Sequence, residues 1–404
     1  MTVLQVNKFW FARGGAERYA LDLSDWLSAQ GHAVVPFAMA HPDNIPTPYD
    51  GLFPPFRDTE HVRFGASGLR TFLSMGWNRA ARRGMKTLIR QTRPHVAHVH
   101  NIYTQLSPSV LDALSKEKVP CVYTVHDHHL VSPSYNLWAD GCGPSIEGKG
   151  VVAATMSRFH KKSYVASFAQ AFTFAAHRRS KAYQVGIDAY LCPSEYMARR
   201  LVAAGFPEEK IRHLPHGIDP DAVAPRFDHD GYVLFVGRLV PEKGVETVLR
   251  VARVLPEVRF RIVGTGPDET RLHVLAHGLT NVEFLGSRFG VDLDELYRGA
   301  AAVLIPSRVH EVFPLVALEA MRAGKPVAAS HVGGMSEVVT DRVTGFLVNP
   351  LDMHGWAEAV LRMVYDDAAR RSMGREGRRQ AETTFHVRRH REKLMGIYRE
   401  IGKT

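Results

Sequence analysis

Short apolar runs alternate with amphipathic stretches along almost the whole chain. In the first half this alternation predicts strands joined by helices, with strands at 2–7, 33–39, 95–100, 121–126 and 189–194 and helices at 15–32, 68–92 and 155–184. A stretch rich in Gly, Pro and Ser at 128–150 is predicted to be a loop. Strands that alternate with helices are typical of parallel sheets covered by helices.

A second alternation starts at residue 232. Its pattern predicts strands at 232–238, 260–266, 282–286, 302–307, 326–330 and 345–348, helices at 243–254, 267–277, 292–300, 314–323 and 334–339, and a helical tail from Met353. The intervening segment 214–225 is dense in proline and glycine, so it is the predicted hinge. We therefore expect an α/β protein with two Rossmann-like domains, 1–215 and 216–384, that face each other across a ligand-binding cleft.

Length and composition agree with a globular protein of two domains. The 404 residues exceed what one hydrophobic core usually serves, and 45% of them are hydrophobic. No apolar run is long enough to span a bilayer, and the first residues lack a secretory pattern. The three cysteines, Cys121, Cys142 and Cys192, have no metal-binding spacing, and an odd number argues against a disulfide framework. We expect a soluble, cytoplasmic protein.

The formal net charge of +10 favours contact with a polyanion or an anionic surface. The cations gather in two clusters, at Arg79, Arg82, Arg83, Lys86, Arg90 and Arg93 and at Arg158, Lys161, Lys162, Arg178, Arg179 and Lys181. Solvated helix faces would explain both clusters equally well. No basic run is interleaved with stacking aromatic residues, which argues against nucleic acid. Peripheral contact with an anionic membrane that holds a lipid-linked acceptor is our hypothesis for these clusters.

Two turns have features of anion-binding loops. Gly14 and Gly15 follow the first strand and open a helix, where a bare backbone and free N–H groups favour a phosphate, although an ordinary turn explains the same glycines. Arg238 and Lys243 lie five residues apart on the turn after the strand at 232–238. A helix start disfavours cations. The two cations are therefore predicted to clamp a diphosphate.

A glycine pair and a carboxylate pair lie further along. Gly264 and Gly266 lack the third glycine of a dinucleotide fingerprint, so they fit either a turn beside a nucleotide base or an ordinary tight turn. Glu311 precedes a helix that is predicted to begin at Pro314, and it is expected to point into the cleft. Glu319 lies inside that helix among apolar residues, where a ribose diol would satisfy its carboxylate unless it faces solvent.

His126 ends a predicted strand and is followed by Asp127, His128 and His129. Neighbours at a strand end point to alternate sides, and no outlying ligands are evident. Contact of His126 with a substrate is therefore preferred to a zinc site, and no metal is expected. His98 and His100 either line the same mouth of the cleft or have a structural role.

Taken together, these residues resemble the retaining GT-B glycosyltransferases of family four, the group 1 glycosyltransferases, over nearly the whole chain. Four motifs match. A glycine loop lies at Gly14-Gly15-Ala16-Glu17-Arg18, and a diphosphate clamp is formed by Gly237-Arg238 with Glu242-Lys243-Gly244. Glu311 and Glu319 give an E-x7-E signature, and a further glycine stretch lies at Gly333-Gly334-Met335-Ser336-Glu337. The segment 128–184 resembles a surface-polysaccharide subgroup. That subgroup often has extra cysteines near Cys142, which stands alone here, and His216 replaces a commoner Asn.

The resemblance implies a role for each matched position. Arg238 and Lys243 would neutralise the departing diphosphate in place of a metal, Glu311 would bind the donor sugar, and Glu319 would hold the ribose. The remaining donor contacts would come from Gly14, Gly15, His126 and the backbone of Phe313, Pro314 and Leu315. His126 would lie near the anomeric carbon, and the C-terminal helix at 385–404 would return to complete the first domain.

The implied activity is transfer of a sugar from a nucleotide-diphosphate sugar to a glycan, lipid-linked or small-molecule acceptor, with no cofactor. Attack on the same face of the sugar, with the leaving phosphate taking the acceptor proton, would retain the anomeric configuration. Two alternatives differ in class. A nucleotide-sugar epimerase or hydrolase on the same fold would need a carboxylate acid/base pair at the reacting carbon. A polyanion-binding protein would be indifferent to Arg238→Ala.

Overall fold

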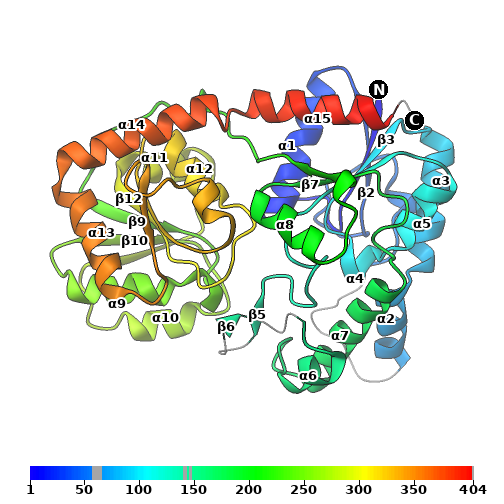
Figure 1. Ribbon diagram of the computed structural model, residues 1–404, viewed down its shortest axis with the longest axis horizontal. Coiled ribbons are helices and arrows are strands. Elements are labelled where there is room, and N and C mark those ends of the chain that lie inside the picture. Colours follow the sequence, from blue (N-terminus) through cyan, green and yellow to red (C-terminus); the bar gives the residue numbers. More distant parts are fainter. Residues whose placement is uncertain (57–65, 140–142, 145–147, 403–404) are drawn as a thin grey trace. The chain divides into compact units, whose positions relative to one another are not determined.

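The computed structural model describes residues 1–56, 66–139, 143–144 and 148–402, and its internal contacts divide the chain into two compact units (Figure 1). Unit 1 comprises Met1–Pro193, Met197–Leu214 and Leu394–Thr404. Unit 2 comprises Ser194–Tyr196 and Pro215–Lys393. Each unit is built around a parallel sheet of six strands.

The sheet of unit 1 has the strand order β2-β1-β3-β4-β7-β8, and every neighbouring pair is parallel. Its strands are β1 (Thr2–Val6), β2 (Ala33–Phe37), β3 (Val96–Val99), β4 (Cys121–Thr124), β7 (Ala189–Cys192) and β8 (Ile211–His213). The five predicted strands are confirmed. The edge strand β8 was not predicted, because three residues are too few to give a periodic signal.

Helices connect these strands, at α1 (Gly15–Ala29), α2 (Ala66–Gly76), α3 (Arg79–Thr92), α4 (Tyr103–Leu106), α5 (Ser109–Lys116), α6 (Val151–Met156), α7 (Tyr164–Arg179) and α8 (Glu195–Ala203), with one-turn helices at η1 (Asp50–Leu52) and η2 (Glu208–Lys210). Both long helical stretches predicted here are divided. Asn78 accepts a hydrogen bond from the N–H of Ala81 and starts α3, and Ser163 does the same for Ala166 and α7. The predicted loop contains a short hairpin, β5 (Trp138–Ala139) and β6 (Gly143–Pro144).

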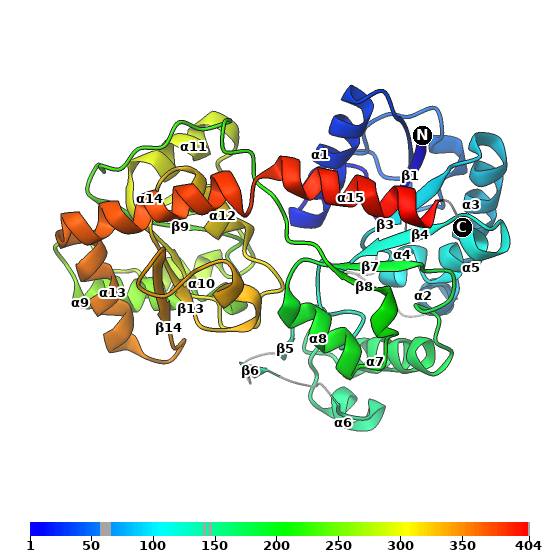
Figure 2. The same cartoon turned by 45° about the horizontal axis from the view of Figure 1, so that its top comes forward.

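The C-terminal helix α15 (Val387–Ile401) closes one face of the sheet of unit 1. Leu394, Met395, Tyr398 and Ile401 are buried with α1 against residues of β1, β3, β4 and β7. Figures 1 and 2 both show α15 beside α1. The first residues of α15, as far as Lys393, cluster with unit 2.

The sheet of unit 2 has the order β11-β10-β9-β12-β13-β14, again entirely parallel. Its strands are β9 (Tyr232–Val236), β10 (Arg259–Val263), β11 (Val282–Gly286), β12 (Ala300–Ile305), β13 (Val327–Ser330) and β14 (Gly345–Val348). All six were predicted. Because β10 and β11 lie on one side of β9 and β12 to β14 on the other, the direction of winding reverses between β9 and β12.

Helices cover both faces of this sheet. Their bounds are η3 (Pro241–Lys243), α9 (Val245–Val254), α10 (Glu269–Leu275), α11 (Gly290–Gly299), α12 (Leu315–Arg322), η4 (Gly333–Glu337), α13 (Met353–Tyr365) and α14 (Asp367–Thr383). One buried cluster packs α9, α10 and α13 against the sheet, and a second packs α11 and α12 against it. No helix in the described part of the chain is long and apolar enough to cross a bilayer.

The cysteines have no assigned chemistry. Cys121 and Cys192 are buried and free, and burial raises the pKa of the Cys192 thiol to about 12. Cys142 lies outside the described residues. It is the cysteine near which the surface-polysaccharide subgroup often has others.

Candidate functional site

The reversal between β9 and β12 places two loops of unit 2 side by side. In open α/β sheets, ligands bind outside the carboxyl ends of the strands at such a reversal. The loop after β9 contains Arg238 and Lys243, and the loop after β12 contains Glu311. Topology therefore brings the loop of Arg238 and Lys243 next to that of Glu311, which lies 68 positions after Lys243 in the sequence.

Lys243 and Glu311 form an ion pair. The Lys243 Nζ donates to Glu311 Oε1 at 2.7 Å, and the Ser307 hydroxyl donates to the same oxygen at 2.6 Å. Glu311 is the more buried partner, with 16% of its side chain exposed against 37% for Lys243. The pairing fixes the ammonium group, and Ser307 was not singled out from the sequence, although it lies in the same loop as Glu311.

Gly244 permits this approach of the two loops. Its φ is +72°, and a Cβ there would overlap the carbonyl oxygen of Pro306 at the end of β12. A further backbone bond, from Arg308 N to Glu242 O at 2.8 Å, ties the loops together. The glycine after Lys243 is thus required by packing within unit 2.

Arg238 is exposed, on a turn that is held firmly by backbone hydrogen bonds. Gly237 N donates to Val263 O and Leu239 N donates to Thr265 O, both at 3.0 Å. Gly264 packs so closely on this turn that a Cβ would overlap the carbonyl oxygen of Gly237, and Gly266 packs in the same way on Leu239. The two glycines therefore support the turn that presents Arg238. Their predicted contact with the donor stays a prediction.

Glu319 lies on α12 and is half-buried. Its Oε2 accepts a hydrogen bond of 2.6 Å from the hydroxyl of Tyr297 on α11. This contact places the carboxylate of Glu319 between α12 and α11, with part of the residue still exposed. Pro314 is buried just before the first residue of α12, and Leu315 begins the helix, as the sequence predicted to within one residue.

The loop between Glu311 and α12 is fixed from two sides. The N–H of Gly334 donates to Glu311 O at 2.8 Å, so the predicted glycine stretch supports the backbone of the carboxylate. The ring of Phe313 lies edge-on to His216, with centroids 5.4 Å apart. His216 is buried and serves as packing under this loop.

In unit 1 the corresponding reversal lies between β1 and β3, and His126 follows the next strand, β4. His126 Nε2 and His100 Nδ1 are 3.0 Å apart, and His100 Nε2 lies 2.8 Å from Gln5 Oε1. These contacts join the two rings and the side chain of Gln5 in one hydrogen-bonded chain. Burial, with His100 and Lys8 nearby, holds the pKa of His126 well below 6.5, so its ring is neutral.

His98 and His100 are fully buried, so neither lines a mouth. His98 bonds the hydroxyls of Tyr398 on α15 and Thr124 on β4, both at 2.6 Å. These contacts give His98 a structural role, which ties the C-terminal helix to the sheet.

Asp127, which directly follows His126, has partners within unit 1. Its Oδ1 accepts hydrogen bonds from the Tyr103 hydroxyl and from the N–H of His129. Burial raises the pKa of Asp127 to about 6 and lowers that of His129 to about 3. His129 stacks on Tyr103, and no group of three metal-ligating side chains occurs among the described residues.

Gly14 differs from the glycines of unit 2. Its φ of −156° is extended backbone that any residue adopts, and a Cβ there would meet only the flexible Glu17 carboxylate, at 3.1 Å. Gly15 is the first residue of α1. The fold of unit 1 therefore does not require a glycine at position 14.

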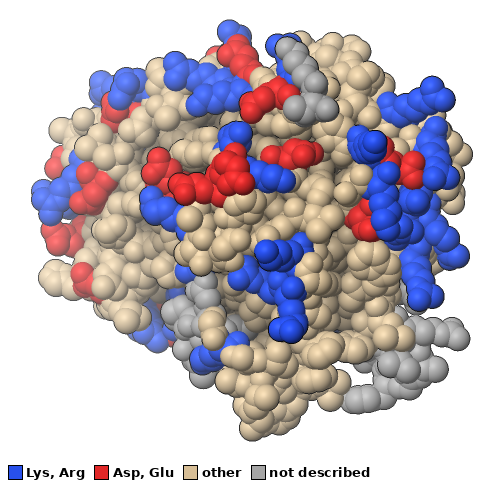
Figure 3. Space-filling view, turned by 45° about the vertical axis from the view of Figure 1, so that its right-hand side comes forward, with Lys and Arg blue, Asp and Glu red and all other residues tan. Residues whose placement is uncertain are grey.

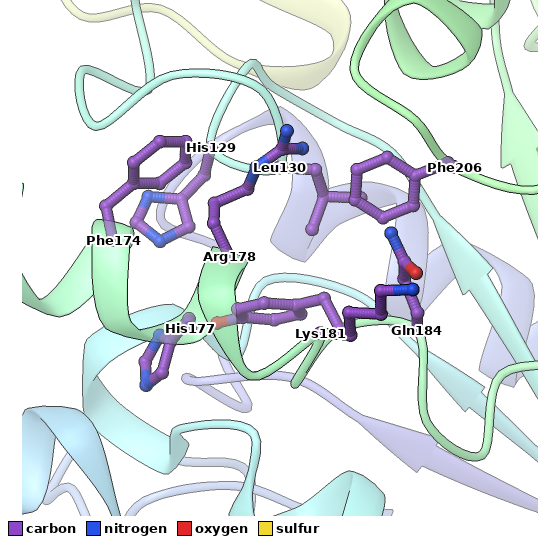
Figure 4. A pocket seen from close by; sticks show the side chains of 9 residues that line it. His129, Leu130, Phe174, His177, Arg178, Lys181, Gln184 and Phe206 are labelled. Carbon is purple, nitrogen blue, oxygen red and sulfur yellow. The ribbon is translucent and has the colours of Figure 1, made fainter. Parts of the chain in front are cut away.

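A separate small cavity lies at the end of α7 in unit 1. Figure 4 shows His129, Phe174 and Arg178 around it, with Lys181 and Gln184 opposite. Its volume of about 20 Å³ is room for one water. It is too small for a sugar or nucleotide.

Two family models match the chain. The model described as Glycosyltransferase Family 4 matches residues 13–222, and that described as Glycosyl transferases group 1 matches residues 221–380. The chain is 31% identical over 212 residues to sulfoquinovosyl transferase SQD2 of Arabidopsis thaliana, with 48% of this chain and 41% of that protein covered. It is 36% identical over 220 residues to D-inositol 3-phosphate glycosyltransferase of Saccharomonospora viridis, with 50% of each covered. The matches thus span about half the length of these relatives.

Solved structures extend the likeness over the whole chain. Sucrose-phosphate synthase from Thermosynechococcus elongatus superposes with a TM-score of 0.73 at 20% identity, over 99% of this chain and 98% of that chain. HepE of Anabaena in complex with UDP gives a TM-score of 0.66 at 18% identity, over 99% and 100%. With two parallel sheets, each flanked by helices, these likenesses confirm the predicted GT-B fold. The chain belongs to the group 1 glycosyltransferases, glycosyltransferase family 4.

Proposed function

We propose that this protein transfers a sugar from a nucleotide-diphosphate sugar to an acceptor, with retention of anomeric configuration and without a metal. The observation with most weight is the Lys243–Glu311 pair, which lies with Arg238 at the reversal point of the unit 2 sheet. HepE, which shares the fold, has been solved with UDP and with UDP-glucose, and both sequence relatives are named as transferases of sugars.

The two cations are proposed to bind the diphosphate. Arg238 is exposed and offers a planar fork of donors, while Lys243 is a compact charge held in place by Glu311. As the bond between the sugar and the diphosphate breaks, negative charge grows on the leaving oxygen, and preorganised cations stabilise it. Two such charges on one loop are the support for a transfer that needs no metal.

Glu319 is proposed to hold the ribose, with Tyr297 as its support. A carboxylate has about four lone-pair positions, so a diol can donate to it while Tyr297 also donates. Glu311 is proposed to accept hydrogen bonds from sugar hydroxyls, and the backbone at 313–315 to cap the sugar and phosphate. Gly264 and Gly266 are proposed to lie beside the base.

The chemical step proposed is attack on one face of the sugar. The bond from the anomeric carbon to the diphosphate oxygen breaks as the acceptor oxygen bonds that carbon, and the leaving phosphate takes the acceptor proton. His126 would contact the sugar as a neutral donor or acceptor, because burial keeps its pKa low. Gly14 and Gly15 would admit the donor close to the backbone. Catalysis would then come mainly from positioning and charge stabilisation.

The acceptor is proposed to be a glycan, a lipid-linked sugar or a small-molecule glycoside, within a surface-polysaccharide subgroup of the family. The support is the segment 128–184, whose sequence resembles that subgroup. A cytoplasmic location fits this role, because nucleotide sugars are intracellular substrates.

Calorimetry with UDP, GDP, ADP and dTDP in the presence of EDTA tests the donor site. We expect one base to bind without metal, and we expect Lys243→Ala and Glu319→Ala to weaken that binding. Glu311→Ala should slow transfer. If no nucleoside diphosphate binds in EDTA, the metal-free donor site is wrong. If all three variants turn over like the wild type, the site assignment is wrong.

Retention and the reaction class need product analysis. With the donor that calorimetry selects, NMR of the product should show the anomeric configuration of the donor. An inverted product would contradict retention. Conversion of the donor in the absence of any acceptor would favour the epimerase or hydrolase alternative.

A further inference from the structure

Two segments of unit 1 have no acidic residue. Residues 66–111 and 148–187 lack both Asp and Glu, and each contains seven Lys and Arg, namely Arg70, Arg79, Arg82, Arg83, Lys86, Arg90 and Arg93 in the first and Lys149, Arg158, Lys161, Lys162, Arg178, Arg179 and Lys181 in the second. The helices α2, α3, α6 and α7 fall in these segments. Their surface is therefore a source of positive potential.

The same helices expose large apolar side chains in helical register. On α7, Val165, Phe168 and Phe172 recur at i, i+3 and i+7 and are 59%, 46% and 47% exposed. A stripe of this spacing is normally turned toward a core. On this helix it is turned toward solvent. The stripe is therefore a candidate contact surface.

The neighbouring helices extend this stripe. On α6, Val152 and Met156 are exposed one turn apart, and Leu73 on α2 and Trp77, which directly follows α2, are exposed as well. These four residues, with Val165, Phe168 and Phe172, define what we call the α6–α7 face. Tyr164, at the start of α7, is exposed as well. With it, eight of the 20 large apolar side chains that are exposed in the described chain lie on these helices or directly after α2.

Contacts within unit 1 hold the three helices together. The rings of Phe72 and Phe172 lie 6.1 Å apart, and His177 Nε2 donates to Gly76 O at 2.9 Å, which joins α7 to α2. Ala154, Phe159 and Ala171 form a small buried cluster between α6 and α7. Figures 1 and 2 both show α7 beside α6 and beside α2. The three helices therefore pack as one group around α7.

The cations near this face differ from those on α3. Arg82, Lys86 and Arg90 of α3 are paired with Asp112 of α5 or with Glu117, which directly follows α5. Arg158, Lys162 and Arg179 have no ion pair with a described carboxylate, and Arg158 lies over the ring of Tyr164 at 5.2 Å. In Figure 3 the lower end of the molecule, where α6 and α7 lie, is mostly uncharged, and blue side chains lie above it.

We propose that the α6–α7 face binds the surface of an anionic lipid bilayer. The apolar stripe would enter the boundary between headgroups and acyl chains, while Arg158, Lys162 and Arg179 contact lipid phosphates. Apolar side chains flanked by unpaired cations complement such a surface. A nucleic acid would match the charge but leave Val165, Phe168 and Met156 without a partner. The proposal goes beyond the proposed function and does not depend on it.

Flotation of the full chain with phospholipid vesicles tests the apolar part. We expect capture by phosphatidylglycerol vesicles and little capture by phosphatidylcholine vesicles. The double variant Val165→Ser with Phe168→Ser should reduce capture about tenfold or more, because two apolar side chains that would be buried in the bilayer are lost. The matched control, Val274→Ser with Tyr365→Ser, removes an aliphatic and an aromatic residue of unit 2 that are even more exposed, at 70% and 62%, and it should change nothing.

The charged part is tested by Lys162→Glu with Arg179→Glu, which should also reduce capture, and by added salt, which should weaken it. Heparin beads provide the comparison with a soluble polyanion. If Val165→Ser with Phe168→Ser leaves capture by vesicles unchanged, or if the wild type binds heparin but no vesicle, the proposal is overturned. Concentration-dependent dimers that the same double variant abolishes, without vesicle capture, would assign the face to a second copy instead.

A fluorescence measurement tests the wild type directly. Trp77 is 43% exposed on this face, whereas Trp10, Trp138 and Trp356 are at most 8% exposed and Trp26 is half-buried on α1. Phosphatidylglycerol with brominated acyl chains should quench part of the tryptophan emission, and Trp77→Phe should remove the quenchable part. Quenching that persists in Trp77→Phe would place a different surface on the membrane. Unchanged thermal unfolding and nucleotide binding of each variant separate a failure here from a failure of the proposed donor site.

Discussion

The two sheets have the same architecture but different chemistry at their points of reversal. In unit 2, the loops after β9 and β12 present an exposed Arg238 and an ion pair between Lys243 and Glu311. In unit 1, the hydrogen-bonded rings of His100 and His126 lie at this edge, and burial holds the pKa of His126 well below its usual value. The loop after β1 also contains Lys8 and the exposed Arg13. The edge of unit 2 therefore presents an ion pair, whereas the edge of unit 1 presents two imidazole rings, with that of His126 neutral.

The glycines of the two edges differ in the same way. Gly244 and Gly264 have positive φ, and backbone carbonyls occupy the space where a Cβ would stand. Gly14 is extended, with open space except for one flexible side chain. A shared glycine-rich turn can therefore arise from packing in one unit and from a ligand in the other. The sequence alone does not separate these causes, but substitutions do.

Gly264→Ala should have the largest effect on the free energy of unfolding, and it tests whether packing fixes the turn after β9. Its new Cβ would overlap a backbone oxygen that cannot move freely, so we expect a loss of about 3 kcal/mol in the free energy of unfolding. Gly278→Ala is the control: φ is +81° but nothing lies within 4 Å, so backbone strain alone should cost about 1 kcal/mol. Urea unfolding measures both. Equal losses would show that packing at Gly264 is unimportant.

Lys243→Ala tests whether the charged edge binds the diphosphate. Loss of a charge-assisted contact should weaken nucleoside diphosphate binding about 100-fold, or about 3 kcal/mol. Lys393→Ala removes an exposed lysine elsewhere in unit 2 and should have no effect. Calorimetry provides the affinities. If both variants bind like the wild type, the ion pair has a structural role only, and the edge of unit 2 does not bind the diphosphate through Lys243.

His129→Gln tests whether the stability of unit 1 depends on a neutral imidazole at this buried position. The pKa of His129 is about 3 when folded and about 6.5 when unfolded, so its contribution to stability is present above pH 6.5 and is lost as pH falls. When the pH falls from about 7.5 to about 5, protonation of this residue in the unfolded state should lower the free energy of unfolding by about 2 kcal/mol. Asp127 acts in the opposite direction, because its raised pKa lets the folded state bind a proton first. The variant should therefore lose less stability than the wild type in urea unfolding at the lower pH, and an equal loss would refute the assignment.

Gly14→Ala should have the smallest effect on stability. Any residue adopts its extended backbone, so the free energy of unfolding should change by less than about 0.5 kcal/mol. If Gly14 admits the donor, affinity for the intact nucleotide sugar should fall about tenfold, or about 1.4 kcal/mol. Calorimetry with donor and with nucleoside diphosphate checks this. Unchanged donor affinity would mean that Gly14 does not approach the donor.

Much of the fold could be predicted from the sequence. All eleven predicted strands are confirmed, because parallel strands buried on both faces are short apolar runs bounded by turns. The weaker predictions concern short or capped elements. The edge strand β8 is too short for periodicity, α5 and α8 were not predicted, and the breaks at Asn78 and Ser163 depend on single capping side chains.

Local periodicity and motif spacing are enough to predict the fold class, the family and the positions of the charged loops. Which side chains meet depends on the way the chain folds in three dimensions. The fold paired Lys243 with Glu311 and Ser307, supported Glu319 with Tyr297 and buried His98 against Tyr398. These partners lie between 4 and 300 residues apart. Strand order and the close approach of backbones select them, and neither leaves a periodic signal along the chain.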